Sequence, residues 1–162
     1  MITKRLYSTI ESSKKVLGTL SNPNLVKTEA YINGKWVPSS SGETFTVTNP
    51  ALYPNPESEL ATMQSMSEED FNSAIESADI AFNKFKKTTG RYRSELLLKL
   101  YNLMISNKDD LAKLVVLENG KPYADALGEV NYAASFFQWF SEEAPRIYGD
   151  IIPSANGTNR IL

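Results

Sequence analysis

The chain has 162 residues, 41% hydrophobic and 22% charged, which is enough for one globular domain and too few for two large ones. Its net charge of -2 indicates no basic surface for nucleic acid. The absence of cysteine and histidine excludes disulfides, thiol nucleophiles, Ser-His-Asp triads and Cys/His metal sites, so we expect no metal centre.

Residues 1–28 are predicted to form a flexible or irregular lead-in, because Ser, Lys and Thr are scattered there without periodicity. Residues 1–10 are basic, rich in hydroxyl groups and free of acidic residues. This composition suits a short mitochondrial presequence, and a solvated, disordered start is the alternative. Since the lack of cysteine fits a reducing compartment, we expect the cytoplasm, with the mitochondrial matrix as the alternative. No apolar run reaches the roughly 20 residues that a membrane helix needs.

Strand and turn signals follow the lead-in. Residues 30–37 predict a tight β-hairpin, because Asn33-Gly34 favours the positive φ angles of a type I′ turn. Residues 44–48 alternate apolar and hydroxyl side chains, which predicts a half-buried strand. Residues 51–58 hold two prolines and predict a loop, and residues 60–66 predict one more short strand.

The spacing of apolar residues predicts three or four helices after residue 66. The first begins at Ser67-Glu68-Glu69-Asp70, which resembles a capping box, and ends near Lys86-Lys87. The next covers residues 91–106, and another lies between Asn107 and the stop signal at Gly120. The last covers residues 123–147 and is apolar nearly all round, so we expect it to be buried on several sides.

The final residues, 149–153 and 160–162, have the pattern of strand fragments around an Asn156-Gly157 turn. A natural domain seldom ends in an unfinished strand, because that leaves an unpaired edge. We therefore expect the chain to be truncated.

The order of these motifs resembles the aldehyde dehydrogenase superfamily. Residues 128–149 further resemble its succinate-semialdehyde dehydrogenase branch. The loop at residues 51–57 departs from the family's usual turn, which leaves the pairing of the next strand open. The other segments that carry the resemblance are the hairpin Tyr31-Ile32-Asn33-Gly34-Lys35-Trp36, Asn49-Pro50, the capped helix at residues 67–85, Arg93-Ser94-Glu95-Leu96-Leu97-Leu98 and Leu117-Glu118-Asn119-Gly120-Lys121-Pro122.

The resemblance implies an α/β parent fold, of which this chain is a mostly helical N-terminal fragment with a β-hairpin and a few short strands. Residues 29–148 form the hairpin and helical part of that domain. Residues 149–162 begin an oligomerisation arm that pairs with a neighbouring subunit. The family oxidises small aldehydes with NAD or NADP, using a nucleophilic Cys, a general-base Glu and a Gly-rich cofactor loop. No position here matches those groups, so we expect this chain alone to be inactive and to bind no cofactor.

The resemblance also places the last predicted helix at the wall of the family's substrate tunnel. Tyr132 and Phe136 are four residues apart, so they share a helix face and both reach that wall. Core packing is the alternative for either residue. We expect solvated or helix-capping roles for the other charged candidates and core positions for the tryptophans; these residues are Glu118, Asn119, Lys121, Glu142, Glu143, Trp36 and Trp139.

Two functional hypotheses follow. The chain is the inactive N-terminal fragment of a succinate-semialdehyde dehydrogenase, an enzyme that converts succinate semialdehyde to succinate in 4-aminobutyrate degradation. The alternative is a non-catalytic binding or regulatory module that associates with full-length aldehyde dehydrogenase subunits through residues 149–162. A truncated reading frame without function is a third reading.

Overall fold

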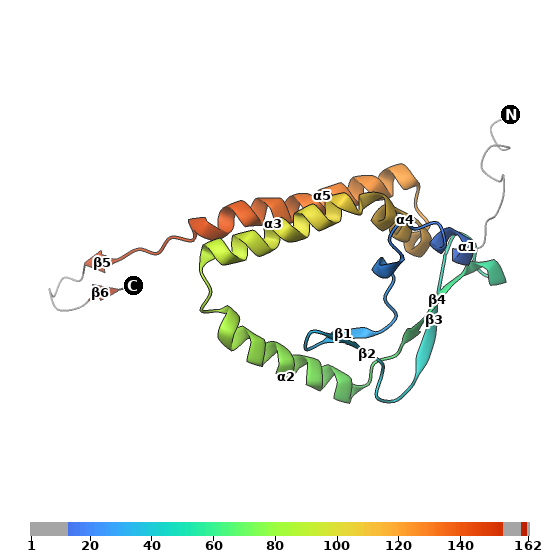
Figure 1. Cartoon of the computed structure of the whole chain (residues 1–162), viewed down its shortest axis with the longest axis horizontal. Helices are drawn as coiled ribbons and strands as arrows, with labels where there is room; N and C mark the ends of the chain where they lie inside the picture. The colour runs from blue at the N-terminus through green and yellow to red at the C-terminus, as the bar shows by residue number, and fades with distance from the viewer. Residues whose placement is uncertain (1–12, 154–159, 162) are drawn as a thin grey trace.

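The computed structural model describes residues 13–153 and 160–161 (Figure 1). This part is mostly helical, with short strands in antiparallel pairs, which confirms the predicted fold class. In chain order the elements, with η for 3₁₀ helices, are α1 (Ser13–Leu17), η1 (Pro23–Leu25), β1 (Ala30–Ile32), β2 (Lys35–Val37), β3 (Thr44–Thr48), η2 (Pro56–Ser58), β4 (Glu59–Gln64), α2 (Glu68–Phe85), α3 (Gly90–Ser106), α4 (Lys108–Asn119), α5 (Tyr123–Glu143), η3 (Ala144–Arg146), β5 (Ile152–Pro153) and β6 (Arg160–Ile161).

The predicted hairpin is confirmed as the pair β1–β2. Its turn residues Asn33 and Gly34 have φ angles of 49° and 77°, which is the left-handed geometry that this dipeptide favours. Tyr31 pairs with Trp36 across the strands, and their ring centroids are 5.2 Å apart. The prediction that the two tryptophans are core residues is wrong for the described part, where Trp36 is 44% exposed and Trp139 is 60% exposed. No second layer within residues 13–153 covers either ring.

The strand at residues 44–48 is confirmed as β3, and it pairs with β4 from Thr44↔Gln64 to Thr48↔Glu59. The unusual loop at residues 51–57 therefore still permits pairing, with a shift in register between Val47 and Thr48. The expected half-burial by alternation is not seen, since Phe45 is exposed. A pair of strands buries a face only when another layer packs on it.

The capping box at the start of α2 is confirmed. Ser67 Oγ accepts a hydrogen bond from the Asp70 amide at 3.2 Å, and Asp70 Oδ2 accepts one from the Ser67 amide at 2.8 Å. The Asp70 carboxylate also accepts from the Ser40 amide, which ties the loop after β2 to the helix. The backbone hydrogen bond from Ser67 is the main cause that lowers the pKa of Asp70 below its ordinary value of 3.8.

The last three helices form a layer, in which α5 packs on α3 and α4 (Figure 1). The buried core of this layer is small and consists of Ala112, Ala126 and Val130, with partly buried neighbours that include Leu111 and Val115. Alanine at the contact allows helix axes to approach closely. Helix α5 ends at Glu143 rather than at the predicted residue 147, because Pro145 has no amide hydrogen to continue an α-helix.

Residues 13–28 hold more regular structure than the sequence predicted. They form α1 and η1, and Leu20 is buried. The order comes from contacts with α4 and β4, far along the chain, rather than from a local pattern. The presequence interpretation concerns residues 1–10, which lie outside the described residues.

Strands β5 and β6 pair, with Ile152 opposite Ile161. The predicted Asn156-Gly157 turn and Leu162 lie outside the described residues. Figure 1 shows this hairpin extending away from the helical layer. Among the described residues no helix has the length and apolarity needed to cross a bilayer.

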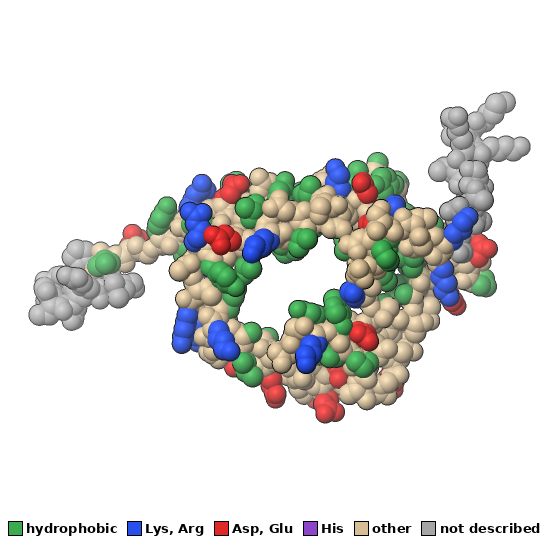
Figure 2. Space-filling model, viewed as in Figure 1, with side chains coloured by type: hydrophobic (Ala, Val, Ile, Leu, Met, Phe, Trp, Pro, Cys, Tyr) green, Lys and Arg blue, Asp and Glu red, His purple; other side chains and the backbone are tan. Residues whose placement is uncertain are grey.

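Helix α2 and the β1–β2 hairpin lie apart from the α3–α5 layer, so the described chain encloses an opening (Figures 1 and 2). Helix α2 packs mainly against β1, and all of its residues are at least partly exposed. The chain thus has one packed helical layer and one helix that faces it across open space.

Candidate functional site

The two residues predicted to line a substrate tunnel lie together on α5. The ring centroids of Tyr132 and Phe136 are 4.8 Å apart with an interplanar angle of 74°, which is the edge-to-face geometry that aromatic rings favour. The shared face inferred from their spacing is therefore confirmed. Their role at the wall of a tunnel stays a prediction.

Helix α5 has two different faces. Ala126, Val130 and Ala134 are buried, and their small side chains lie on the side toward α3 and α4. Tyr132 is 68% exposed and Phe136 is 45% exposed, so core packing does not account for either ring within the described residues. An exposed aromatic face provides an apolar wall for a ligand, but it has no group that transfers protons near neutral pH.

The charged candidates of this helix region form pairs or face solvent. Glu142 is exposed, and Glu143 accepts a hydrogen bond from Arg146 Nη1 at 2.6 Å. Lys121, in the loop between α4 and α5, is paired with Glu129 of α5, so its ammonium group joins this loop to α5. The cap of α4 is Gly120, whose φ is 80° and whose amide donates to the Val116 carbonyl.

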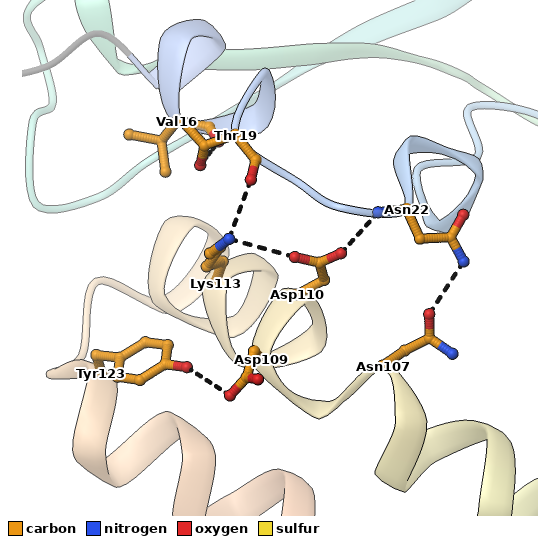
Figure 3. A network of polar contacts seen from close by, with 8 residues as sticks. All are labelled: Val16, Thr19, Asn22, Asn107, Asp109, Asp110, Lys113 and Tyr123. Atoms are coloured by element: carbon orange, nitrogen blue, oxygen red, sulfur yellow. Dashed lines mark hydrogen bonds and ion pairs between the residues drawn. The ribbon is translucent and has the colours of Figure 1, made fainter.

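A polar network, which the sequence did not predict, joins the N-terminal segment to α4 (Figure 3). The Asn22 amide donates to Asp110 Oδ2 at 2.8 Å, and Asn22 Nδ2 donates to Asn107 Oδ1 at 3.0 Å. Lys113 Nζ donates to the Thr19 carbonyl at 3.0 Å and to Asp110 Oδ1 at 3.3 Å. The network holds η1 and the preceding turn against the start of α4.

Asp110 is the centre of this network and is almost fully buried. The hydrogen bond from the Asn22 amide is the main cause that lowers the pKa of Asp110 below its ordinary value of 3.8, and Lys113 adds to the effect. Beside it, the Tyr123 hydroxyl donates to Asp109 Oδ1 at 3.0 Å, which raises the pKa of Tyr123 above its ordinary value of 10.0. The network consists of contacts between segments of this chain, so we assign it a structural role.

The sequence contains one signal for this network, namely the two acids Asp109 and Asp110 in the first turn of α4. That signal indicates a helix start and does not identify the partner. Asn22 lies 88 residues away from Asp110, and one sequence does not reveal such a contact.

A nicotinamide dinucleotide needs a binding site for its pyrophosphate group. Such cofactors place their pyrophosphate at a helix N-terminus that opens with glycine. Gly90 opens α3, but a Cβ placed there would already lie 2.6 Å from the Ala144 carbonyl oxygen, so this helix end is occupied by η3. The described residues also contain no group of His, Cys, Asp or Glu side chains suited to a metal ion. The start of α3 therefore provides no pyrophosphate site of this kind.

The chain is similar to curated dehydrogenases and to solved structures of such enzymes. The chain is 45% identical over 143 residues to a 3-sulfolactaldehyde dehydrogenase of Pseudomonas putida. It is 41% identical over 143 residues to an NADP(+) succinate-semialdehyde dehydrogenase of Escherichia coli. Each match covers 88% of this chain and 29% of the relative. A crystal structure of succinate-semialdehyde dehydrogenase from Burkholderia pseudomallei is 38% identical, with a TM-score of 0.81 over 88% of this chain and 29% of that one.

The chain thus spans less than a third of the length of the relatives that it matches. Family members use NADP or NAD, as the names and complexes of relatives state. The profile of the aldehyde dehydrogenase family matches residues 36–162, which is most of the chain. Sequence match, fold and motif order agree, and the chain belongs to the aldehyde dehydrogenase family.

Proposed function

We propose that this chain is the N-terminal part of an NAD(P)-dependent dehydrogenase that oxidises succinate semialdehyde to succinate, as in 4-aminobutyrate degradation. The observation that carries the proposal is the similarity to a succinate-semialdehyde dehydrogenase over 88% of the chain, which includes the α5 segment. The relative that acts on 3-sulfolactaldehyde narrows the substrate class, since that molecule and succinate semialdehyde both carry an aldehyde and an acidic group. The proposed substrate is therefore a small anionic aldehyde.

In this proposal, helix α5 forms part of the wall of the substrate site. The groups that react with the aldehyde belong to polypeptide outside these 162 residues. Aldehyde oxidation of this type needs a thiolate nucleophile, a base that activates water and a nicotinamide site. The 162 residues contain no cysteine, so the thiolate comes from outside them. Tyr132 and Phe136 supply an apolar wall that orients the carbon chain of the substrate.

Two assays test the proposal. The purified chain alone is expected to show no aldehyde-dependent reduction of NAD(+) or NADP(+), and turnover by this chain would refute the proposed division of labour. A chimera in which this chain replaces the matched part of the E. coli relative tests the substrate. We expect its kcat/KM for succinate semialdehyde to stay within about tenfold of the relative, equivalent to a change of about 1.4 kcal/mol in transition-state binding. A chimera that prefers butyraldehyde would contradict the proposed substrate.

A specific feature favours a second candidate function, a binding module for aldehyde dehydrogenase subunits. The β5–β6 hairpin extends from the helical layer (Figure 1). Ile152 at its start and the preceding Ile151 are exposed. Such an edge can add a strand to the sheet of another subunit. Light scattering on a micromolar mixture with the full-length E. coli enzyme is expected to show a mixed species that disappears when residues 149–162 are deleted. Separate elution of the two proteins would rule out this function.

We propose the cytoplasm as the compartment, because the lack of cysteine fits a reducing compartment. The basic, hydroxyl-rich residues 1–10 keep the mitochondrial matrix as the alternative. Imaging of the chain with a fluorescent protein at its C-terminus distinguishes the two compartments. Loss of a mitochondrial signal after deletion of residues 1–10 would establish the matrix.

A further inference from the structure

Two Asn-Gly pairs lie among the described residues, and the structure places them in different surroundings. Asn33-Gly34 forms the two-residue turn of the β1–β2 hairpin, and Asn119-Gly120 lies at the end of α4. Both asparagines are exposed. An Asn-Gly pair is chemically labile, because glycine has no side chain to shield its amide nitrogen from the neighbouring carboxamide carbon. The surroundings of the two glycine amides therefore decide which pair reacts first.

The Gly34 amide is free to react. It donates no hydrogen bond to any residue that the structure describes. A Cβ placed on Gly34 would meet only the Tyr31 hydroxyl, at 4.0 Å, so the space around the turn is open. Within the described part of the chain, the Asn33 carboxamide makes no hydrogen bond either. No contact within this part of the chain thus holds the two reacting groups of this pair apart.

The Gly120 amide, in contrast, is engaged. It donates a hydrogen bond to the Val116 carbonyl at 2.8 Å. A Cβ placed on Gly120 would lie 3.3 Å from Pro50 Cγ and 3.4 Å from Ala51 Cβ, so neighbouring chain crowds this position. The Gly120 amide can attack the Asn119 carboxamide only after the helix end frays and this hydrogen bond breaks. A hydrogen bond of ordinary strength slows such a reaction by about fivefold.

We propose that Asn33 is a site of spontaneous deamidation, and that the folded chain favours this site over Asn119. The Gly34 amide nitrogen loses its proton and attacks Cγ of Asn33. A bond forms between these two atoms, the bond from Cγ to the side-chain nitrogen breaks, and ammonia leaves. Water then opens the cyclic imide, at the side-chain carbonyl to give aspartate or at the main-chain carbonyl to give isoaspartate. Water is the only other reactant, and nothing is oxidised or reduced.

The isoaspartate product changes the hairpin. Its main chain passes through the former side chain and is longer by one carbon atom. The lengthened turn no longer matches the register that pairs Ile32 with Lys35 and Tyr31 with Trp36. Since α2 packs mainly on β1, a loss of this register also loosens α2. The aspartate product keeps the normal main chain, and aspartate tolerates the left-handed geometry of this turn.

Peptide mapping tests the proposal. The 162-residue chain is incubated in mildly alkaline buffer, and samples taken over time are digested with trypsin and analysed by mass spectrometry. Asn33 lies in the tryptic peptide that follows Lys27 and ends at Lys35, so its conversion is measured separately from that of Asn119. We expect Asn33 to convert at least about fivefold faster than Asn119. We also expect an isoaspartyl methyltransferase to label the Asn33 peptide, while circular dichroism confirms that the chain stays folded.

The same incubation in urea separates the effect of the fold from that of the dipeptide. We expect the two rates to converge in urea, because both glycine amides are free in the unfolded chain. Equal rates in the folded chain, or faster conversion of Asn119, would overturn the proposal. Conversion of Asn33 only in urea would overturn it as well, since the fold would then protect the turn.

Asn33→Ser is the matched variant, because it removes the carboxamide from the turn. We expect it to abolish both the mass change and the methyl label in this peptide, and a label that persists would also contradict the site. The inference goes beyond the proposed function and does not rest on it. Deamidation requires neither aldehyde nor cofactor, so a chimera that ignores succinate semialdehyde would refute the substrate and leave the modification site intact.

Discussion

Gly90 and Ala144 are so close that a Cβ on Gly90 would lie 2.6 Å from the Ala144 carbonyl oxygen and 3.1 Å from the Pro145 Cα. This contact fixes the start of α3 against η3, where the last helix ends. Both atoms belong to the backbone, so neither can rotate away as a side chain does. The close approach depends on the absence of a side chain at position 90.

Gly90→Ala is therefore expected to lower the free energy of unfolding by about 1–3 kcal/mol, the usual effect of overpacking a fitted contact. Urea denaturation followed by circular dichroism measures this change. Gly128→Ala is the matched control, because it lies inside α5 with open space around it. We expect that variant to be stabilised by about 0.5–1 kcal/mol, since alanine favours helix over glycine. Equal stability of the two variants would show that the contact is not tight.

Ser67→Ala removes the side chain that caps α2. The Asp70 amide then loses its acceptor, and the expected loss of stability is about 0.5–2 kcal/mol. The same denaturation experiment detects it. Ser73→Ala, an exposed substitution inside the same helix, serves as the control and should change stability by less than about 0.5 kcal/mol. If Ser73→Ala lowers the stability as much as Ser67→Ala does, the capping box contributes little.

Acidification is expected to release the N-terminal segment from α4. The pKa of Asp110 is lowered in the folded chain, so the unfolded chain binds protons more readily. This contribution to stability is complete above the ordinary value of 3.8 and is lost as the pH falls through the lower folded pKa. Melting curves between neutral and strongly acidic pH measure the loss.

Asp110→Asn distinguishes this network from the other carboxylates. The variant has no proton to gain at position 110, so its stability should depend less steeply on pH below 3.8 than that of the original chain. Asp70, whose pKa is also lowered, keeps titrating in both proteins and provides the residual slope. Identical slopes for the two proteins would contradict the assigned role of Asp110.

Phe136→Ala, tested in the chimera with the E. coli relative, is expected to raise KM for succinate semialdehyde by roughly tenfold through loss of an apolar contact. The change in kcat should be smaller, because the ring contacts no reacting atom in the proposed site. Tyr132→Phe preserves the ring and should behave like the original. Phe45→Ala removes an exposed aromatic ring on β3 and is the control for surface effects. Unchanged KM in Phe136→Ala would remove α5 from the substrate site.

The sequence predicted those features that depend on neighbouring residues. The Asn33-Gly34 turn and the Ser67 cap follow from local chemistry and are confirmed in the structure. The contacts of Gly90 with Ala144 and of Asn22 with Asp110 join distant segments, and no local pattern encodes them.

The candidate site likewise has one feature that the sequence predicted and one that it did not. The four-residue spacing of Tyr132 and Phe136 predicted that the rings share a face, since the spacing follows from helix geometry. The exposure of Trp139 was not predictable. Apolar periodicity identifies the side chains that favour burial, but it does not tell whether the covering layer is present among the same 162 residues.

The separation of α2 from the helical layer has a consequence for hydrogen exchange. The helix is anchored at its first turn by Ser67 and Asp70, and along its side it packs mainly on β1. Its amides can therefore exchange with solvent deuterium through an opening that leaves α3, α4 and α5 folded. We expect the α2 amides to lose protection before those of α5, so the chain unfolds in at least two steps rather than as one cooperative unit.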